Sequence, residues 1–180
     1  LFSEPRKGKL SKENLPDILK IPAIRSFPAD ETHLETYIWK GNKNVILLVH
    51  GWESNASRWE KLLPYLQKTG NTIVALDAPA HGLSGGTEFN VIKYAHYIDI
   101  AVKQYKPSVL IGHSIGGAAC IYYQSQFQNQ DLMKMVILGA PSDYTLIVAN
   151  YVRLLSLNKR MRQLLEAAFS TKFNKEISQF

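Results

Sequence analysis

Hydrophobic residues along the chain fall into five segments with the pattern of β-strands. Residues 35–41 alternate polar and apolar side chains, which is typical of a strand with one exposed face. The other four segments are almost continuous apolar runs, which are typical of strands buried on both faces. These runs cover residues 44–51, 71–79, 108–114 and 135–141.

Between these segments the apolar residues recur at intervals of three and four, which predicts helices. Residues 59–66 and 91–102 each have one apolar face, and residues 115–127 are apolar nearly all round. Pro64 is acceptable in the first of these if the regular helix starts just before it. Strands separated by single helices imply right-handed crossovers. We therefore expect an α/β fold, with a mostly parallel sheet flanked by helices on both faces.

The pattern changes after Pro141, where only helical periods remain. We expect residues 1–141 to form the sheet-and-helix core and residues 142–180 to form a separate helical segment. No internal repeat or low-complexity linker interrupts the sequence.

Composition limits the classes of function. The net charge is +6, but residues 51–150 balance seven basic against seven acidic residues, so the excess lies near the two ends. These basic residues are better explained as a solvated surface than as a nucleic-acid-binding site, because no aromatic residues for base stacking are interleaved with them. No apolar run approaches the length of about 20 residues that crosses a bilayer. A single cysteine, Cys120, excludes a disulfide framework, so we expect a cytoplasmic protein.

The strongest chemical signal is the sequence Gly112-His113-Ser114-Ile115-Gly116, where a buried strand runs into a helix. A sharp turn at this point strains the middle residue and projects its side chain from the sheet edge. The flanking glycines allow the two backbones to pass closely, and the new helix directs free N–H groups toward the serine. The alternatives are an ordinary strand-to-helix turn or an anion-binding helix start. A Walker A loop is excluded, because no Gly-Lys-Ser/Thr follows.

Two further motifs follow earlier strands. His50-Gly51-Trp52 ends one of them, and Asp77-Ala-Pro-Ala-His-Gly-Leu-Ser84 ends the next. With these three motifs in order, residues 35–141 resemble the α/β-hydrolase family. The resemblance implies that Ser114 is the nucleophile and that the backbone N–H groups of Trp52 and Ile115 form an oxyanion hole. It also implies that His50 braces its loop and that residues 77–84 shape the pocket wall.

The same resemblance raises a difficulty, because the family's catalytic acid and histidine follow the nucleophile in the chain. All five histidines precede Ser114: His33, His50, His81, His96 and His113. A surrogate base at His50 or His81 remains a minor alternative, and His113 should point away from its neighbour. Asp143 lies where some relatives carry the acid, although a helix cap explains it better. The histidine spacing does not fit a metal site, and we expect neither metal nor cofactor.

We therefore expect the catalytic histidine outside this chain and little activity from the 180-residue form. The resemblance implies that residues 142–180 begin a helical lid. In that case the strand at 135–141 has an open flank, covered by missing chain or by a second copy. Lys159, Arg160 and Arg162 could attract an anionic substrate, but a solvated helix face explains them better.

The sequence thus predicts a serine hydrolase that cleaves a small ester-like substrate through an acyl-enzyme on Ser114. It leaves open a catalytically silent binding module that keeps the fold, and an acyltransferase that uses the same serine. Substrate identity, ester against thioester or amide, and assembly state are not determined by these residues.

Overall fold

The computed structural model describes residues 4–141 and 144–173. The chain divides into two compact units, Leu1–Ala140 and Pro141–Phe180, which are described separately. The boundary lies next to Pro141, where the helical pattern begins.

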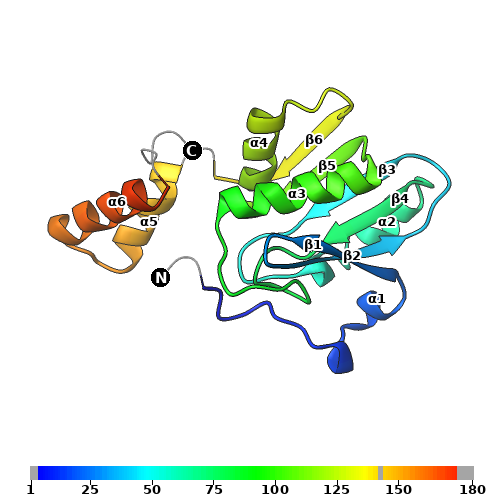
Figure 1. Cartoon of the computed structure of the whole chain (residues 1–180), viewed down its shortest axis with the longest axis horizontal. Coiled ribbons are helices and arrows are strands. Elements are labelled where there is room, and N and C mark those ends of the chain that lie inside the picture. Colours follow the sequence, from blue (N-terminus) through cyan, green and yellow to red (C-terminus); the bar gives the residue numbers. More distant parts are fainter. Residues whose placement is uncertain (1–3, 142–143, 174–180) are drawn as a thin grey trace. The chain divides into compact units, whose positions relative to one another are not determined.

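Six strands form one sheet in the order β1-β2-β4-β3-β5-β6 (Figure 1). β3, β4, β5 and β6 are parallel, whereas β2 is antiparallel to both of its neighbours. The strands are β1 (Ala23–Ala29), β2 (Thr32–Trp39), β3 (Val45–Val49), β4 (Thr72–Leu76), β5 (Val109–His113) and β6 (Lys134–Leu138). The predicted α/β class and mostly parallel sheet are confirmed.

Strand β1 was not expected from the sequence. It contains Arg25, Ser26 and Pro28, and it has no alternation of apolar residues. Proline is tolerated there because β1 is an edge strand, where a missing N–H donor breaks no ladder. The pairing with β2, in which Pro28 lies opposite His33, supplies the order that the local sequence does not.

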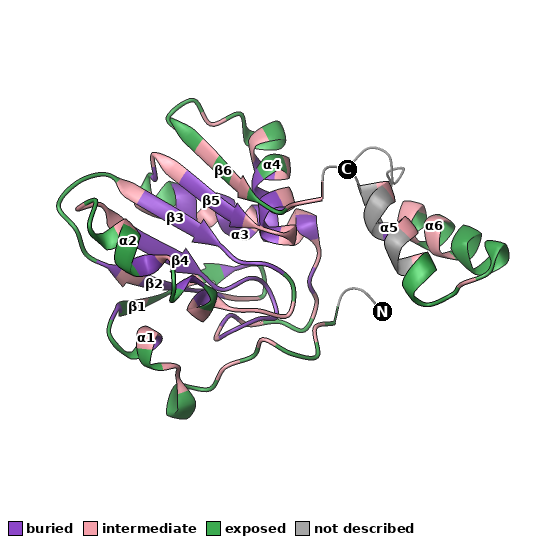
Figure 2. Cartoon of the chain, turned by 180° about the vertical axis from the view of Figure 1, so that it is seen from behind, coloured by how far each residue is buried: buried purple, intermediate pink, exposed green. Residues whose placement is uncertain are grey.

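Helices cover both faces of the sheet (Figures 1 and 2). α3 (Val91–Tyr105) and α4 (Ile115–Phe127) pack together on one face. The other face carries α1 (Asp17–Lys20), the 3-10 turn η2 (Ala56–Trp59) and α2 (Leu63–Gln67), while a further turn, η1 (Lys12–Asn14), precedes α1.

The central strands are buried on both faces, as their unbroken apolar runs predict. In β3, Ile46 and Leu48 pack with Trp59 in one cluster, while Leu47 and Val49 are fully buried on the opposite side. Figure 2 shows this burial as a continuous purple band through the middle of the sheet. A rigid core of this kind fixes the carboxyl ends of β3, β4 and β5 relative to one another.

In the helical region at 59–66 the regular helix starts just before Pro64, as the sequence requires. A 3-10 turn ends at Trp59, and α2 begins only at Leu63 with Pro64 in its first turn. Proline fits the first turn of a helix but not its interior, because it lacks an N–H donor and clashes with the preceding turn. Pro64 therefore sets the late start of the regular helix.

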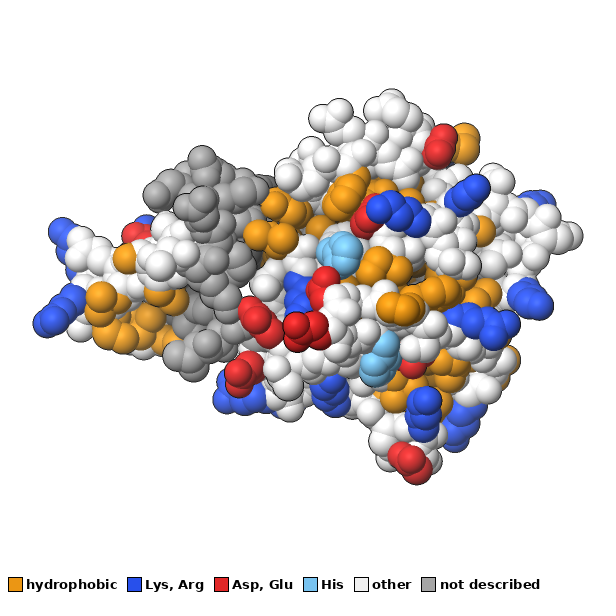
Figure 3. Space-filling model, in the orientation of Figure 1, with side chains coloured by type: hydrophobic (Ala, Val, Ile, Leu, Met, Phe, Trp, Pro, Cys, Tyr) orange, Lys and Arg blue, Asp and Glu red, His pale blue; other side chains and the backbone are white. Residues whose placement is uncertain are grey.

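The second unit contains α5 (Tyr144–Leu154) and α6 (Lys159–Phe173). Hydrophobic side chains gather on its surface beside basic ones (Figure 3). The exposed apolar residues are Leu154, Leu155, Met161 and Leu164. Lys159 and Arg160 are exposed, and Arg162 forms an ion pair with Glu166 at 2.8 Å, as a solvated helix face would. The assignment of this unit as part of a lid stays a prediction.

The outer edge of β6 is open among the described residues. There β6 pairs only with β5, and its Val136 and Leu138 are each 39% exposed.

Among the described helices, none combines the length and the hydrophobicity that a membrane span needs.

Candidate active site

Ser114 stands between the last residue of β5 and the first residue of α4. Its backbone has φ 55° and ψ −127°, a conformation that non-glycine residues rarely adopt. Its N–H donates to the carbonyl of Leu138 at 2.9 Å, which ties the turn to the neighbouring strand. Ser114 is only partly buried. The strained turn predicted from the motif is present, and it leaves the hydroxyl side chain within reach of solvent.

The glycines of the motif make this turn sterically feasible. A Cβ placed on Gly116 would lie 2.2 Å from the carbonyl oxygen of His50 and 2.6 Å from that of Val49. A Cβ on Gly112 would lie 2.6 Å from the Cα of Gly117. The first turn of α4 therefore passes directly against the end of β3 and against β5.

This close packing brings the second motif to the serine. An ideal Cβ on Gly51 would lie 3.1 Å from the Cβ of Ser114, although the two residues are far apart in the sequence. Trp52 follows Gly51, and its side chain is 36% exposed. Among the described residues, neither the Trp52 N–H nor the Ile115 N–H donates a hydrogen bond. Unpaired backbone donors beside a helix N-terminus are what a developing oxyanion requires.

His50 is fully buried, and both of its ring nitrogens are occupied. Nε2 accepts a hydrogen bond from the Ala78 N–H at 2.9 Å, so Nδ1 carries the proton and donates to the Gly51 carbonyl at 2.7 Å. Burial lowers the pKa of His50 to about 3. The ring is therefore neutral and joins the loop after β3 to the loop after β4, which suits a brace and does not suit a general base.

His81 has the same arrangement. Its Nε2 accepts from the Glu53 N–H at 3.0 Å, and its Nδ1 donates to the Pro79 carbonyl at 2.8 Å. Burial lowers its pKa below the ordinary value. Its ring also contacts Trp52 and Phe89 edge-on, with centroids 5.4 and 5.2 Å away. The surrogate base considered for His50 or His81 is thus not favoured at either position.

The remaining three histidines have other partners. His113 accepts at Nε2 from the Arg58 guanidinium at 3.1 Å. Burial is the larger cause of its lowered pKa, and the positive charge of Arg58 is the smaller one. Its ring therefore contacts η2 on the face of the sheet opposite α4. His33 Nε2 lies 2.9 Å from the Leu83 carbonyl oxygen, and His96 Nε2 lies 3.4 Å from Oδ1 of Asp30.

Asp77 organises the loop after β4. Its carboxylate accepts from the Tyr37 hydroxyl and from the backbone N–H groups of Ala56 and Leu83, each at 2.8 Å. Burial raises the pKa of Asp77 to about 6, although these hydrogen bonds oppose the shift. A Cβ on Gly82 would overlap the same carboxylate, so glycine is required there. Asp77 therefore shapes the loop, and both of its carboxylate oxygens already accept hydrogen bonds.

Asp143, the weaker candidate for the acid, lies outside the described residues. Within the described ranges, no group of three or more His, Cys, Asp or Glu side chains could hold a metal ion. Cys120 is buried, and burial raises the pKa of its thiol well above the ordinary value.

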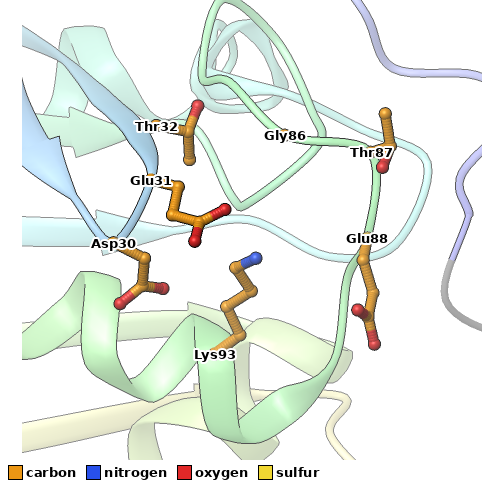
Figure 4. A pocket seen from close by; sticks show the side chains of 7 residues that line it. All are labelled: Asp30, Glu31, Thr32, Gly86, Thr87, Glu88 and Lys93. Carbon is orange, nitrogen blue, oxygen red and sulfur yellow. The ribbon is translucent and has the colours of Figure 1, made fainter.

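An open hollow lies elsewhere on the first unit (Figure 4). It is lined by residues 30–32 at the β1–β2 turn, residues 86–88 and Lys93, whose ammonium group extends toward the carboxylate of Glu31. It contains charged groups and threonine hydroxyls, but no histidine or cysteine lines it. Ser114 is not among the residues that line this hollow, so the candidate active site stays at the turn between β5 and α4.

Sequence reasoning missed two residues near the site. Arg58 was not singled out, because its contact with His113 spans 55 positions of sequence. Lys9 was not singled out either, although its ammonium group reaches the carbonyls of Ser84 and Gly86. Neither position belongs to a motif, so only the folded chain reveals these contacts.

Comparison with known proteins identifies the family and the fold. The sequence profile of the α/β-hydrolase fold matches residues 44–180. A putative esterase/lipase of Mycoplasma genitalium is 28% identical over 121 residues, which are 64% of this chain and 44% of that protein. A bifunctional esterase/perhydrolase of Acinetobacter calcoaceticus is 32% identical over 101 residues, which are 53% of this chain and 36% of that protein. The chain thus spans less than half the length of these relatives.

Solved structures show the same fold. Mouse α/β-hydrolase domain-containing protein 10 superposes with a TM-score of 0.66 at 17% identity, covering 81% of this chain and 59% of its own. An esterase from Exiguobacterium antarcticum superposes with a TM-score of 0.60 at 22% identity, covering 65% of this chain and 45% of its own. Because the profile matches most of the sequence and the strand order places its motifs at one sheet edge, this chain belongs to the α/β-hydrolase fold family.

Proposed function

We propose that this protein is a serine hydrolase that cleaves carboxylic esters through an acyl-enzyme on Ser114. The observation that supports this most strongly is the position of Ser114. It is strained, partly exposed and next to Gly51, with the free N–H groups of Trp52 and Ile115 beside it. The esterase names of two relatives agree in reaction class.

In the proposed reaction, Ser114 Oγ attacks the ester carbonyl carbon and loses its proton to a general base. The carbonyl oxygen becomes an oxyanion that accepts hydrogen bonds from Trp52 and Ile115. Collapse breaks the bond to the alkoxide, which takes the proton from the base and leaves as the alcohol. Water then attacks the acyl-enzyme by the same route and releases the acid.

We place the base outside these 180 residues. Both ring nitrogens of His50 and of His81 are occupied by hydrogen bonds. His113 accepts from Arg58 at Nε2, so in the neutral ring its unpaired Nδ1 carries the proton. A histidine that must accept the serine proton needs an unprotonated, unoccupied nitrogen within hydrogen-bond reach. On this proposal the 180 residues alone turn over esters slowly or not at all.

A second candidate rests on the same histidine geometry. A binding module that keeps the strained turn at Ser114 but has no base would show the occupied histidines seen here. An acyltransferase would use the same first step with an alcohol or thiol in place of water. Ester turnover by the full-length protein separates the enzyme from the silent module, and the fate of the acyl group separates hydrolysis from transfer.

The cellular setting and the partners are also proposals. We expect a cytoplasmic protein that acts on a small ester-like substrate, without nucleic acid. The exposed Val136 and Leu138 on β6 support covering of this edge by further chain or by a second copy.

The test is to incubate the full-length protein with p-nitrophenyl esters of increasing acyl length, and with matched thioester and anilide substrates. We expect saturable release of p-nitrophenol, a preference for esters over anilides, and free carboxylic acid as the product. Absence of turnover with every ester would contradict the proposal and favour the silent module.

A further inference from the structure

The N-terminal segment of residues 6–10, called here the strap, lies across the two loops of the candidate site. It pairs with the loop after β4: the Gly82 N–H donates to the Gly8 carbonyl at 2.7 Å, and the Leu10 N–H donates to the Gly82 carbonyl at 2.9 Å. These bonds connect positions more than 70 residues apart in the sequence. The strap therefore holds the 77–86 loop from outside the sheet.

The same strap also contacts the loop after β3. The Arg6 N–H donates to the Glu53 carboxylate at 3.0 Å, and the Asn55 side chain donates to the Gly8 carbonyl at 3.3 Å. Gly8 has φ 87°, and a Cβ there would lie 2.5 Å from the Ser54 carbonyl oxygen. Only glycine allows this close approach to the loop that carries Trp52.

Lys9 adds a charged link between the strap and the second loop. Its ammonium group donates to the carbonyls of Ser84 and Gly86 at 3.1 and 3.3 Å. Partial burial lowers the pKa of Lys9, and the carboxylate of Asp77 partly opposes that shift. Hydrogen bonds from a charged donor are stronger than those from a neutral one. Lys9 therefore restrains residues 84–86 more firmly than the backbone bridge alone.

The two loops meet directly behind the proposed oxyanion donor. Glu53 follows Trp52, has a left-handed φ of 47°, and donates its N–H to His81 of the second loop. A strained residue persists only where its surroundings hold it, and Glu53 is held at its N–H by His81 and at its carboxylate by the strap.

We propose that the strap is a positioning element that keeps the Trp52 N–H directed at the oxyanion. This inference rests on the proposed function of Ser114. It assigns to the strap a role in the chemical step beyond general stability, because the strap contacts both Glu53, the residue next to the donor, and the 77–86 loop, whose His81 accepts from the Glu53 N–H. Lys9 and Gly8 act through the loops and do not touch the substrate.

The experiment compares Lys9→Met with Lys7→Met in the full-length protein. Both variants remove one positive charge from the same segment, but Lys7 is exposed and makes none of the described hydrogen bonds or ion pairs. We expect Lys9→Met to lower kcat about tenfold with KM within about twofold of wild type, since a misplacement of about 1 Å can cost about 100-fold and the loss of one contact shifts the loop by less. Lys7→Met should match wild type, and Lys9→Arg should restore most of kcat.

A second measurement does not depend on activity. Amide hydrogen exchange of the peptide covering residues 51–56 should accelerate in Lys9→Met and in Gly8→Ala, and should stay unchanged in Lys7→Met. Equal kcat and equal exchange in Lys9→Met and Lys7→Met would overturn the proposal, as would a change in KM alone.

The two proposals can fail separately. If the wild-type protein cleaves no ester, the proposed function fails, and the exchange data alone decide whether the strap holds the loop. If the wild type is active and Lys9→Met keeps full kcat, the strap proposal fails while the proposed function stands.

Discussion

Replacing Ser114 by alanine in the full-length protein is expected to lower kcat for a p-nitrophenyl ester by about 10⁶-fold, because loss of the nucleophile in a serine hydrolase has this magnitude. Initial rates under saturating substrate measure the change. The fold should persist, because Ser114 binds its neighbours through its backbone: its N–H donates to Leu138, and its carbonyl accepts from Gly117 and Ala118. Serine and alanine both carry a Cβ, so the substitution adds no steric backbone strain to that already present at φ 55° and ψ −127°.

Ser125→Ala is the matched control for this variant. Ser125 is an exposed serine on α4, the helix that Ser114 precedes; its hydroxyl donates to the Tyr122 carbonyl one turn earlier and accepts from the Gln126 side chain. We expect its kcat to stay within about twofold of wild type, as for surface substitutions away from a site. A Ser114→Ala protein that keeps a tenth of its activity or more would show that another group forms the acyl intermediate.

Replacing Gly116 by alanine is expected to have the largest effect on stability. The new Cβ would meet two backbone oxygens at the end of β3, those of His50 at 2.2 Å and of Val49 at 2.6 Å. Neither backbone can move without breaking the β3–β5 pairing that supports the site. Forced overpacking costs 1–3 kcal/mol where side chains can adjust, so we expect at least about 3 kcal/mol here. Urea denaturation followed by circular dichroism measures the change.

Gly139→Ala separates this clash from simple backbone strain. Gly139 has φ 58°, and nothing lies within 4 Å of a Cβ built on it. We therefore expect a loss of only about 1 kcal/mol, from the left-handed conformation alone. Equal losses for Gly116→Ala and Gly139→Ala would contradict the close approach between α4 and β3.

The central part of the fold could be predicted from the sequence because local pattern and tertiary context agree there. Helix α4 has the predicted bounds, since the glycines at its start and the apolar run that follows mark both its beginning and its packing. Strand β1 could not be predicted, because its order comes from pairing with β2 and its own residues lack alternation. The start of the regular helix just before Pro64 was signalled by the residue itself, although the preceding 3-10 turn was not.

The candidate site, like the fold, could be predicted from the sequence only in part. The motif at residues 112–116 predicts a strained serine, and Ser114 has the backbone conformation that this motif requires. The roles assigned to Ser114, Trp52 and Ile115 remain proposals. The occupied nitrogens of His50 and His81 could not be predicted, because their donors lie 28 positions away in each case. The strap was equally invisible, since Lys9 and Gly82 belong to no common pattern.

The proposed function requires that Ser114 is an activated nucleophile beside a backbone oxyanion hole. A fluorophosphonate probe reports this activation without any choice of substrate, because the probe bonds covalently to an activated serine and leaves the others unmodified. We expect one adduct per molecule of full-length protein, located by tandem mass spectrometry at Ser114 and absent from Ser114→Ala. An adduct on a different residue, or labelling that survives the substitution, would show that Ser114 is not this nucleophile.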